Sequence, residues 1–208
     1  MIQDLNINIE GISLEEKKIR EENLSIFNKK GFPNKRLEEW KFTDLNKIIV
    51  DNFIELKIKK KSIEEIELNK ITDFDHNYIH LVNGFLKSNS FEHEDKNKFK
   101  ITEHKYNENK IEDLKANNSL INLNNALYEG GYSLEIFENY KFKKPLIIYN
   151  NFTDNLKNKI VNNRNKIILN NNSNLDLLEI NSDISKENFI QNNYTTIKIG
   201  KNSSLNNY

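Results

Sequence analysis

The fold of this chain turns on the stretch Gly31-Phe32-Pro33-Asn34-Lys35-Arg36-Leu37-Glu38-Glu39-Trp40-Lys41-Phe42-Thr43-Asp44-Leu45, which contains the only tryptophan. Gly31 and Pro33 predict that the preceding helix ends here, because glycine takes the left-handed conformation that ends helices and proline cannot continue one. The residues that follow predict a short amphipathic helical segment running toward Ile48. We expect Trp40 and Phe42 to be buried and the charged side chains to face water or one another: Lys35, Arg36, Glu38 and Glu39.

Helices are predicted on both sides of a more irregular middle region. Ser13 can cap the first helix, and Glu16 stands at the reciprocal position of a capping box. Apolar side chains then recur at spacings of three and four as far as Phe27, which is the helical period. A second helix is predicted over residues 119–127, where the leucines and the alanine share one face before Gly130-Gly131 ends it.

Most of the remaining sequence has a β-type pattern. The apolar run Tyr78–Val82 is followed by Asn83-Gly84, which is a strong hairpin signal. A further strand is predicted over residues 98–103. After Gly131, short apolar runs alternate with turns rich in Asn, Ser, Asp and Gly, and these runs cover residues 134–137, 146–149, 166–169, 175–180 and 196–199.

Two of these β units repeat each other. Residues 167–175 match residues 197–205 position for position, with Ile167 opposite Ile197 and Leu175 opposite Leu205. A repeated strand–turn–strand unit predicts stacked coils, because one unit cannot bury its own apolar face. A β-solenoid explains this pattern better than a sandwich, and an ordinary antiparallel sheet remains the alternative.

The last residues bear on how such a stack would be completed. The chain stops at Tyr208, where the second repeat begins its return strand, without a helix or charge cluster that could cap a stack. An uncapped end exposes strand edges and core. We therefore expect either that this chain is the front part of a longer protein or that another subunit covers the open end.

Composition excludes several classes of protein. Lys+Arg and Asp+Glu both number 31, so nothing favours nucleic acid or an anionic membrane as a partner. The absence of cysteine excludes disulfides and thiolate ligands for zinc or an iron–sulfur cluster. No apolar run approaches the roughly 20 residues of a membrane span, and the start lacks the features of a signal peptide. We expect a soluble, cytoplasmic protein.

The histidines are weak candidates for a metal site. His76 and His80 are four residues apart, a spacing that can chelate a metal on a helix. Their neighbours favour a strand, which would separate them by about 13 Å. His93 lies in a charged stretch, and we interpret it, like His76, His80 and His104, as a structural or solvated histidine.

Other candidate motifs also have simpler interpretations. Gly200–Ser204 is superficially similar to a phosphate loop, but Thr195 stands where the first glycine is required, so we predict a β-turn. Asp176 and Glu179 could act as the carboxylates of a carbohydrate-cleaving enzyme, although we expect them to lie on a solvent-facing strand surface. Trp40 could anchor an interface, but packing in the core is the preferred interpretation.

The order Gly-Φ-Pro-x-(Lys/Arg)-x-x-Glu-Glu-Trp-Lys-(Phe/Tyr)-Thr-x-Leu, where Φ is an apolar residue, resembles the N-terminal signature of the SufD family. Members of this family are scaffold subunits of the SUF iron–sulfur cluster assembly system. The residues that carry the resemblance are Gly31, Pro33, Glu38, Glu39, Trp40, Asn83 and Gly84. Further segments similar to the family lie at residues 120–131, 144–148, 164–169 and 197–205, so that the resemblance spans about residues 13–208.

This resemblance implies a fold and a set of partners. It implies a mixed α+β chain with an N-terminal helical and mixed region over residues 1–131, then the first coils of a right-handed parallel β-helix over residues 132–208. The family's C-terminal helical region would be absent. The implied function is that of a non-catalytic scaffold, which pairs with a SufB-like subunit and with a SufC-like ATPase that contacts the family beyond the position of Tyr208.

The resemblance also implies what the chain itself does not do. We expect no catalytic residue, no bound cofactor and no metal, with the Fe–S cluster belonging to the full complex, and we expect the motif residues to be structural or docking. Two alternatives stay open, namely a β-solenoid carbohydrate-binding or carbohydrate-active protein and a small β-rich domain without a partner.

Overall fold

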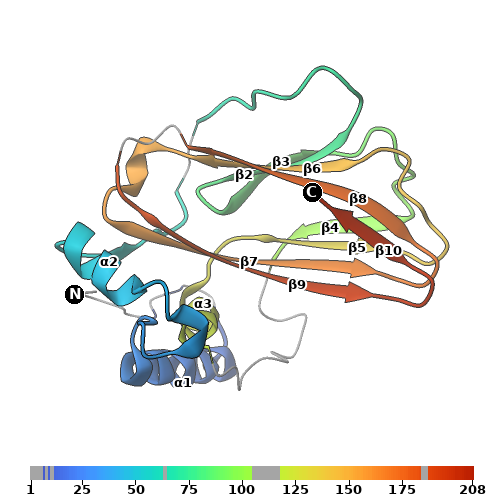
Figure 1. The fold of residues 1–208 in the computed structure, drawn as a ribbon. Coiled ribbons are helices and arrows are strands. Elements are labelled where there is room, and N and C mark those ends of the chain that lie inside the picture. Colours follow the sequence, from blue (N-terminus) through green and yellow to red (C-terminus); the bar gives the residue numbers. More distant parts are fainter. Residues whose placement is uncertain (1–6, 8, 10–11, 63–64, 105–117, 184–186) are drawn as a thin grey trace.

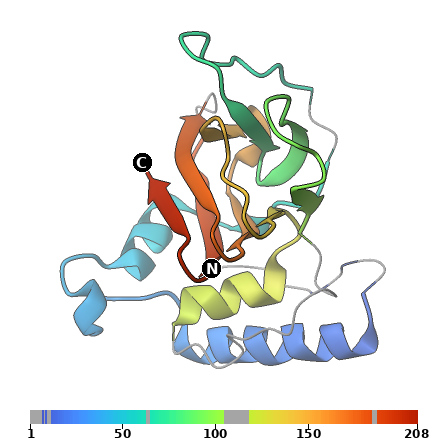
Figure 2. The same cartoon turned by 90° about the vertical axis from the view of Figure 1, so that its right-hand side faces the viewer.

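The computed structural model describes residues 7, 9, 12–62, 65–104, 118–183 and 187–208 (Figure 1). In Figures 1 and 2, α1 and α3 lie side by side beneath the strands. The helical elements are α1 (Leu14–Lys30), the 3-10 turn η1 (Glu38–Trp40), α2 (Leu45–Asn52), α3 (Ser119–Leu127) and the 3-10 turn η3 (Asp154–Leu156).

The local signals for the helix ends are confirmed. The Ser13 hydroxyl accepts a hydrogen bond from the Glu16 N–H at 3.1 Å and so caps α1. Gly31 ends this helix at a φ of 68°, and its N–H donates to the Phe27 carbonyl. The predicted bounds of α3 are also confirmed. The prediction of one helical segment from Trp40 toward Ile48 is wrong, because Asp44 caps α2 as a separate helix after η1.

The strands form two mixed sheets. In the first sheet the order is β1-β7-β5-β4, and β9 also pairs with β7. Its strands are β1 (Lys57–Ile58), β4 (Phe99–Glu103), β5 (Tyr132–Ile136), β7 (Lys159–Leu169) and β9 (Ile190–Ile199). In the second sheet the order is β10-β8-β6-β2-β3. Its strands are β2 (Asn77–Val82), β3 (Phe85–Ser90), β6 (Leu146–Phe152), β8 (Asn174–Asp183) and β10 (Ser204–Asn207).

The main hydrophobic core lies between the two sheets. Alternate side chains of β5 and β7 meet those of β2, β6 and β8, as expected for strands whose side chains point to opposite faces in turn. A second cluster joins the helices to the start of β7, and it holds Phe27, Phe32, Ile49, Leu56, Leu123, Ala126, Leu127 and Ile160. This second cluster anchors the segment that follows α1.

The repeat found in the sequence is confirmed as the strand register. Ile167 pairs with Ile197 between β7 and β9, and Leu175 pairs with Leu205 between β8 and β10. The turns of the two units also match, because Asn172 and Asn202 both take positive φ values, 58° and 56°. The Asn202 amide donates to the Asn172 side chain at 3.2 Å, which links one turn to the next.

The parallel β-helix predicted for residues 132–208 is wrong, although the mixed α+β class is confirmed. Two mixed sheets are present instead, and the described strands form neither a solenoid nor a closed structure. In particular, β3 runs antiparallel to β2, and β4 antiparallel to β5. The repeat determines the register of neighbouring strands but not whether sheets close. The two-residue turn at Asn83-Gly84 can join only antiparallel strands.

The alternative prediction, an ordinary antiparallel sheet, is also wrong. β7 pairs in parallel with β5 and β9, and β6 pairs in parallel with β2 and β8. The chain therefore combines parallel neighbours, set by the repeat, with antiparallel partners at one edge of each sheet.

Candidate functional site

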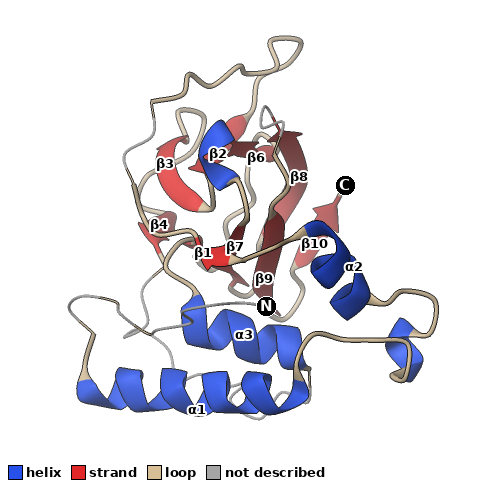
Figure 3. Cartoon of the chain, turned by 90° about the vertical axis from the view of Figure 1, so that its left-hand side faces the viewer, coloured by secondary structure: helices blue, strands red, loops and turns tan. Residues whose placement is uncertain are grey.

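The motif segment leaves the end of α1 and returns to the body of the protein at α2 (Figure 3). Phe32 packs against Phe27 with ring centroids 5.1 Å apart, so the segment is tethered at its start. Pro33 is buried, and its carbonyl accepts a hydrogen bond from the Asn46 N–H at 3.0 Å. These contacts hold both ends of the segment while its middle stays on the surface.

The charged turn at the middle of the segment is η1. Glu38 and Glu39 are exposed, as predicted, and the Lys41 ammonium pairs with the Glu38 carboxylate at 2.6 Å. Trp40 is only half-buried and belongs to none of the core clusters of the described residues, so the expectation that it packs in the core is wrong. The expectation that Phe42 is buried is wrong, because its side chain is 86% exposed. The motif therefore displays two carboxylates and one large aromatic ring to the surroundings.

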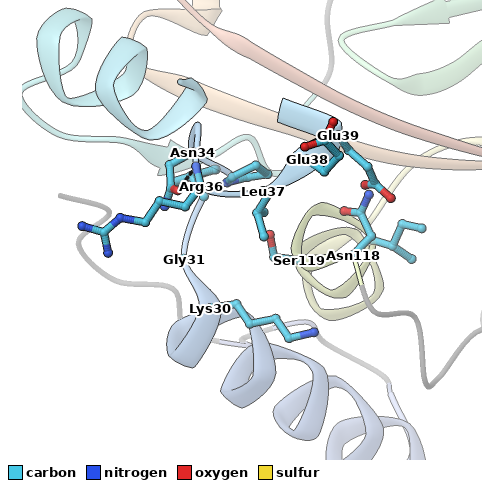
Figure 4. Close-up of a pocket in the computed structure, with 12 residues that line it drawn as sticks. Lys30, Gly31, Asn34, Arg36, Leu37, Glu38, Glu39, Asn118 and Ser119 are labelled. Carbon is cyan, nitrogen blue, oxygen red and sulfur yellow. Dashed lines mark hydrogen bonds between the residues drawn. The ribbon is translucent and has the colours of Figure 1, made fainter. Parts of the chain in front are cut away.

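A groove of about 710 Å³ lies between this segment and the first turn of α3 (Figure 4). We call it the motif groove. Its walls come from parts of the chain far apart in sequence, and the residues around it include Lys30, Gly31, Pro33, Leu37, Glu38, Glu39, Asn118, Ser119 and Ile121. The structure thus brings four predicted motif residues, Gly31, Pro33, Glu38 and Glu39, to one site.

The first turn of α3 gives the motif groove its hydrogen-bonding character. The Asn118 side chain caps the helix by accepting from the Leu120 N–H at 2.9 Å. Other N–H groups of a first helical turn have no partner within the helix. Ser119 is only 6% exposed, and it lies in the lining of the groove.

Asn83 and Gly84 lie elsewhere, in the turn between β2 and β3. The Asn83 side chain donates to the Thr153 hydroxyl at 2.8 Å and accepts from the Thr153 N–H at 3.0 Å. Gly84 takes a φ of 85°, and a Cβ there would lie 2.7 Å from Val161 Cγ1. Both residues serve the packing of this turn, and the structure does not bring them to the motif groove.

The histidines lie where packing or solvent explains them. His76 contacts the Phe74 carbonyl through Nδ1 at 3.0 Å and the Tyr149 hydroxyl through Nε2 at 2.9 Å. His80 is buried, and this burial lowers its pKa. Within the described part of the chain, no three His, Cys, Asp or Glu residues are grouped so that they could hold a metal ion.

His104 gives a testable pH dependence. Burial, together with the nearby charges of Arg164, Lys166 and Arg20, lowers its pKa to about 4 from an ordinary value of 6.5. Between pH 6.5 and about pH 4, His104 is protonated in the unfolded chain but stays neutral in the folded chain. The free energy of unfolding should therefore fall as the pH drops through this range. Urea titrations at about pH 7.5 and about pH 5 measure this loss.

A His104→Gln variant is the control for this prediction. Carboxylates and the other histidines, including the buried His80, contribute to acid destabilisation in both chains, whereas only the wild type contains the imidazole of His104. The variant should therefore lose less stability over the same pH interval. Equal losses in the two chains would show that His104 does not carry the effect.

The remaining sequence candidates do not form a site. Gly200–Ser204 is a turn that leads into β10, as predicted, and no helix follows it among the described residues. Asp176 is exposed and accepts from the Asn206 amide at 2.7 Å, while Glu179 is exposed and accepts from the Asn150 amide at 2.6 Å. Both carboxylates thus take part in side-chain contacts along β8.

Sequence reasoning missed the contribution of α3 to the motif groove. Asn118 and Ser119 precede the predicted helical pattern and are typical helix-start residues, so their local role could have been found. Their position beside Glu38 and Glu39 could not, because about eighty residues separate them in the chain and only tertiary packing brings them together.

Comparison with known proteins agrees with the motif. The family described as SufBD protein N-terminal region matches residues 13–109, from the cap of α1 through the motif and the β2–β3 hairpin. No curated protein matches the chain. No described helix is long and apolar enough to cross a membrane. Because the matched family covers SufB and SufD alike, the assignment to SufD remains a prediction. Residues 13–109 are therefore similar to the N-terminal region of the SufB and SufD proteins.

Proposed function

We propose that this chain is a non-catalytic scaffold of the SufD kind, which pairs with a SufB-like subunit and a SufC-like ATPase in the cytoplasm. The family match over residues 13–109 supports the assembly role. The observation that carries the scaffold role is the display of the motif. Glu38, Glu39 and Phe42 are exposed on a segment whose two ends are held by packing and hydrogen bonds, which suits contact with another protein.

In this proposal the Fe–S cluster is the cargo of the complex and not a group held by this chain. Iron–sulfur clusters are bound mainly by cysteine thiolates, and the sequence contains no cysteine. Thiolate ligands would therefore come from the other subunits. The contribution of this chain is positional, since its packed sheets offer a stiff body on which partners can be arranged.

Co-purification tests the proposal. The chain is tagged, co-expressed with the SufB-like and SufC-like proteins of the same source, and recovered at physiological salt. We expect the SufB-like subunit to elute with it in a constant ratio, because obligate subunits bury large apolar interfaces that survive washing. The composition of the eluted complex is measured by mass spectrometry.

The control is a tagged, unrelated protein of similar size expressed with the same two partners. Circular dichroism of the isolated chain establishes that the bait is folded. A folded bait that retains neither protein would contradict the proposed partnership. Retention of the SufC-like ATPase without the SufB-like subunit would contradict the pairing with SufB.

A further inference from the structure

Helix α3 lies between α1 and the strands, as Figures 1 and 2 show. Amide side chains join this helix to β7 and β9. Asn124 Nδ2 donates to the backbone carbonyls of Asn163 and Asn192, at 3.1 and 2.8 Å. Asn192 Nδ2 in turn donates to the Leu120 carbonyl at 3.0 Å and to Asn162 Oδ1 at 2.9 Å. We call the side chains of Asn124, Asn162 and Asn192 the amide seam.

The hydrogen bonds of the amide seam are incomplete. Asn124 Oδ1 and Asn162 Nδ2 are buried and have no hydrogen-bond partner, and the two residues are 0% and 5% exposed. A buried polar atom without a partner costs free energy that is recovered when water reaches it. Opening the seam would therefore hydrate both atoms, whereas opening an apolar interface exposes hydrocarbon to water.

Apolar contact between the helices and the first sheet is restricted in extent. The second cluster includes Leu123, Ala126 and Leu127 of α3 together with Phe27 of α1. The apolar residues of the first sheet in this cluster belong to the short β1 and to the first two residues of β7 and β9, namely Ile58, Ile160 and Ile190. The rest of the seat of α3 on the sheet is polar.

One side chain holds the two helices to each other. The Arg20 guanidinium of α1 donates to the carbonyls of Ala126 and Tyr128 at the end of α3, at 3.1 and 3.0 Å. Just beyond α3, the chain is fixed to the sheet, because the Arg164 N–H donates to the Gly130 carbonyl at 3.0 Å. The connection from Tyr128 to Gly130 is thus where a joined pair of helices could turn relative to β7.

We propose that α1 and α3 open from the sheet together, as one unit, at the amide seam. Water would replace the seam's hydrogen bonds, while the apolar and Arg20 contacts between the two helices would stay. Such an opening is a local equilibrium of the native chain and not its global unfolding. It is a property of this chain alone and does not depend on the proposed SUF partners, so it can fail independently of the co-purification.

Hydrogen exchange of the whole chain, followed by mass spectrometry at increasing urea below the unfolding transition, tests this proposal. We expect peptides from α1 and α3 to exchange through one common opening with the same dependence on urea. Their protection should be at least tenfold lower than that of peptides from β5 and β6, which lie in the main core. This comparison needs only the wild-type chain.

A double variant, Asn162→Leu/Asn192→Leu, tests the seam itself. It replaces both members of a cross-strand amide pair with apolar side chains, a change that can be neutral or stabilising because neither member keeps a lost partner. Opening would then expose two leucines, so we expect the protection of α1 and α3 to rise about tenfold. Circular dichroism and urea midpoints check that the variant folds.

Asp176→Leu/Asn206→Leu is the matched control. These residues also form a hydrogen-bonded cross-strand pair, between β8 and β10, but they lie outside the seam. The control should leave the protection of α1 and α3 unchanged. Three results would overturn the proposal: α1 and α3 exchanging only with the main core, the two helices exchanging through different openings, or a folded seam variant whose helices are no better protected than those of the control.

Discussion

Gly131→Ala is expected to destabilise the protein by about 3–5 kcal/mol, a large share of the total stability of a typical domain. Gly131 has a φ of 119°, a region that is open almost only to glycine. A Cβ at this position would lie 1.8 Å from the Arg164 carbonyl oxygen and 2.6 Å from its carbon. Because these are backbone atoms of β7, no side-chain rotation relieves the overlap. Urea titration of the purified variant measures the loss.

Gly31→Ala is the matched control for this prediction. Gly31 also has a positive φ, 68°, but nothing lies within 4 Å of the position that a Cβ would take there. With a ψ of −168°, Gly31 lies in a backbone region open almost only to glycine, so the substitution carries this backbone cost without a steric clash and we expect a smaller loss of about 1–3 kcal/mol. Similar losses in the two variants would show that β7 moves aside and that the close approach to Arg164 is not the cause.

Arg20→Met is expected to cost about 3–5 kcal/mol, because it leaves a buried carboxylate without its partner. The Arg20 Nε lies 2.9 Å from Glu16 Oε1, and both side chains are at least 95% buried. The guanidinium also donates to the carbonyls of Ala126 and Tyr128 and lies 4.3 Å from the centre of the Tyr128 ring. One side chain thus joins α1 to the end of α3. Urea midpoints measure the loss.

Two further variants separate the ion pair from general changes in α1. Lys17→Met removes an exposed pair with Glu21 at the same helical spacing, and it should change stability by less than about 0.5 kcal/mol. The double variant Glu16→Met/Arg20→Met removes both buried charges, so it should be more stable than Arg20→Met alone. Strictly additive losses in the double variant would contradict a buried pair whose members depend on each other.

The sequence predicted correctly what short-range chemistry controls. Ser13 caps α1, Gly31 ends it, and Asn83-Gly84 forms the hairpin turn, because each of these features depends on the backbone preferences of a few neighbouring residues. The match between residues 167–175 and 197–205 also predicted the strand register correctly. Side chains at matching positions must face the same core, and a slip of one residue would expose them.

Larger-scale inferences from the same patterns were less successful. The repeat suggested a β-helix, but repeated register is compatible with any pair of parallel strands and contains no information on closure. The antiparallel edge strands β3 and β4 make the sheets mixed. Phe42 was expected in the core because aromatic residues usually bury surface, yet the segment is held by Phe32 and Pro33, and this leaves Phe42 in solvent.

By itself, the sequence determined the family motif, the helix ends, the hairpin and the register of the repeated strands. Each of these depends on the conformational preferences of neighbouring residues or on a periodic pattern that can be recognised without knowing how the rest of the chain folds. Only the tertiary structure decided that Glu38 and Glu39 would stand beside Ser119 and that Arg20 would reach the end of α3. Such contacts join residues far apart in sequence. They form because α1, α3 and β7 pack around a shared core, and this packing fixes the positions of the side chains beside it.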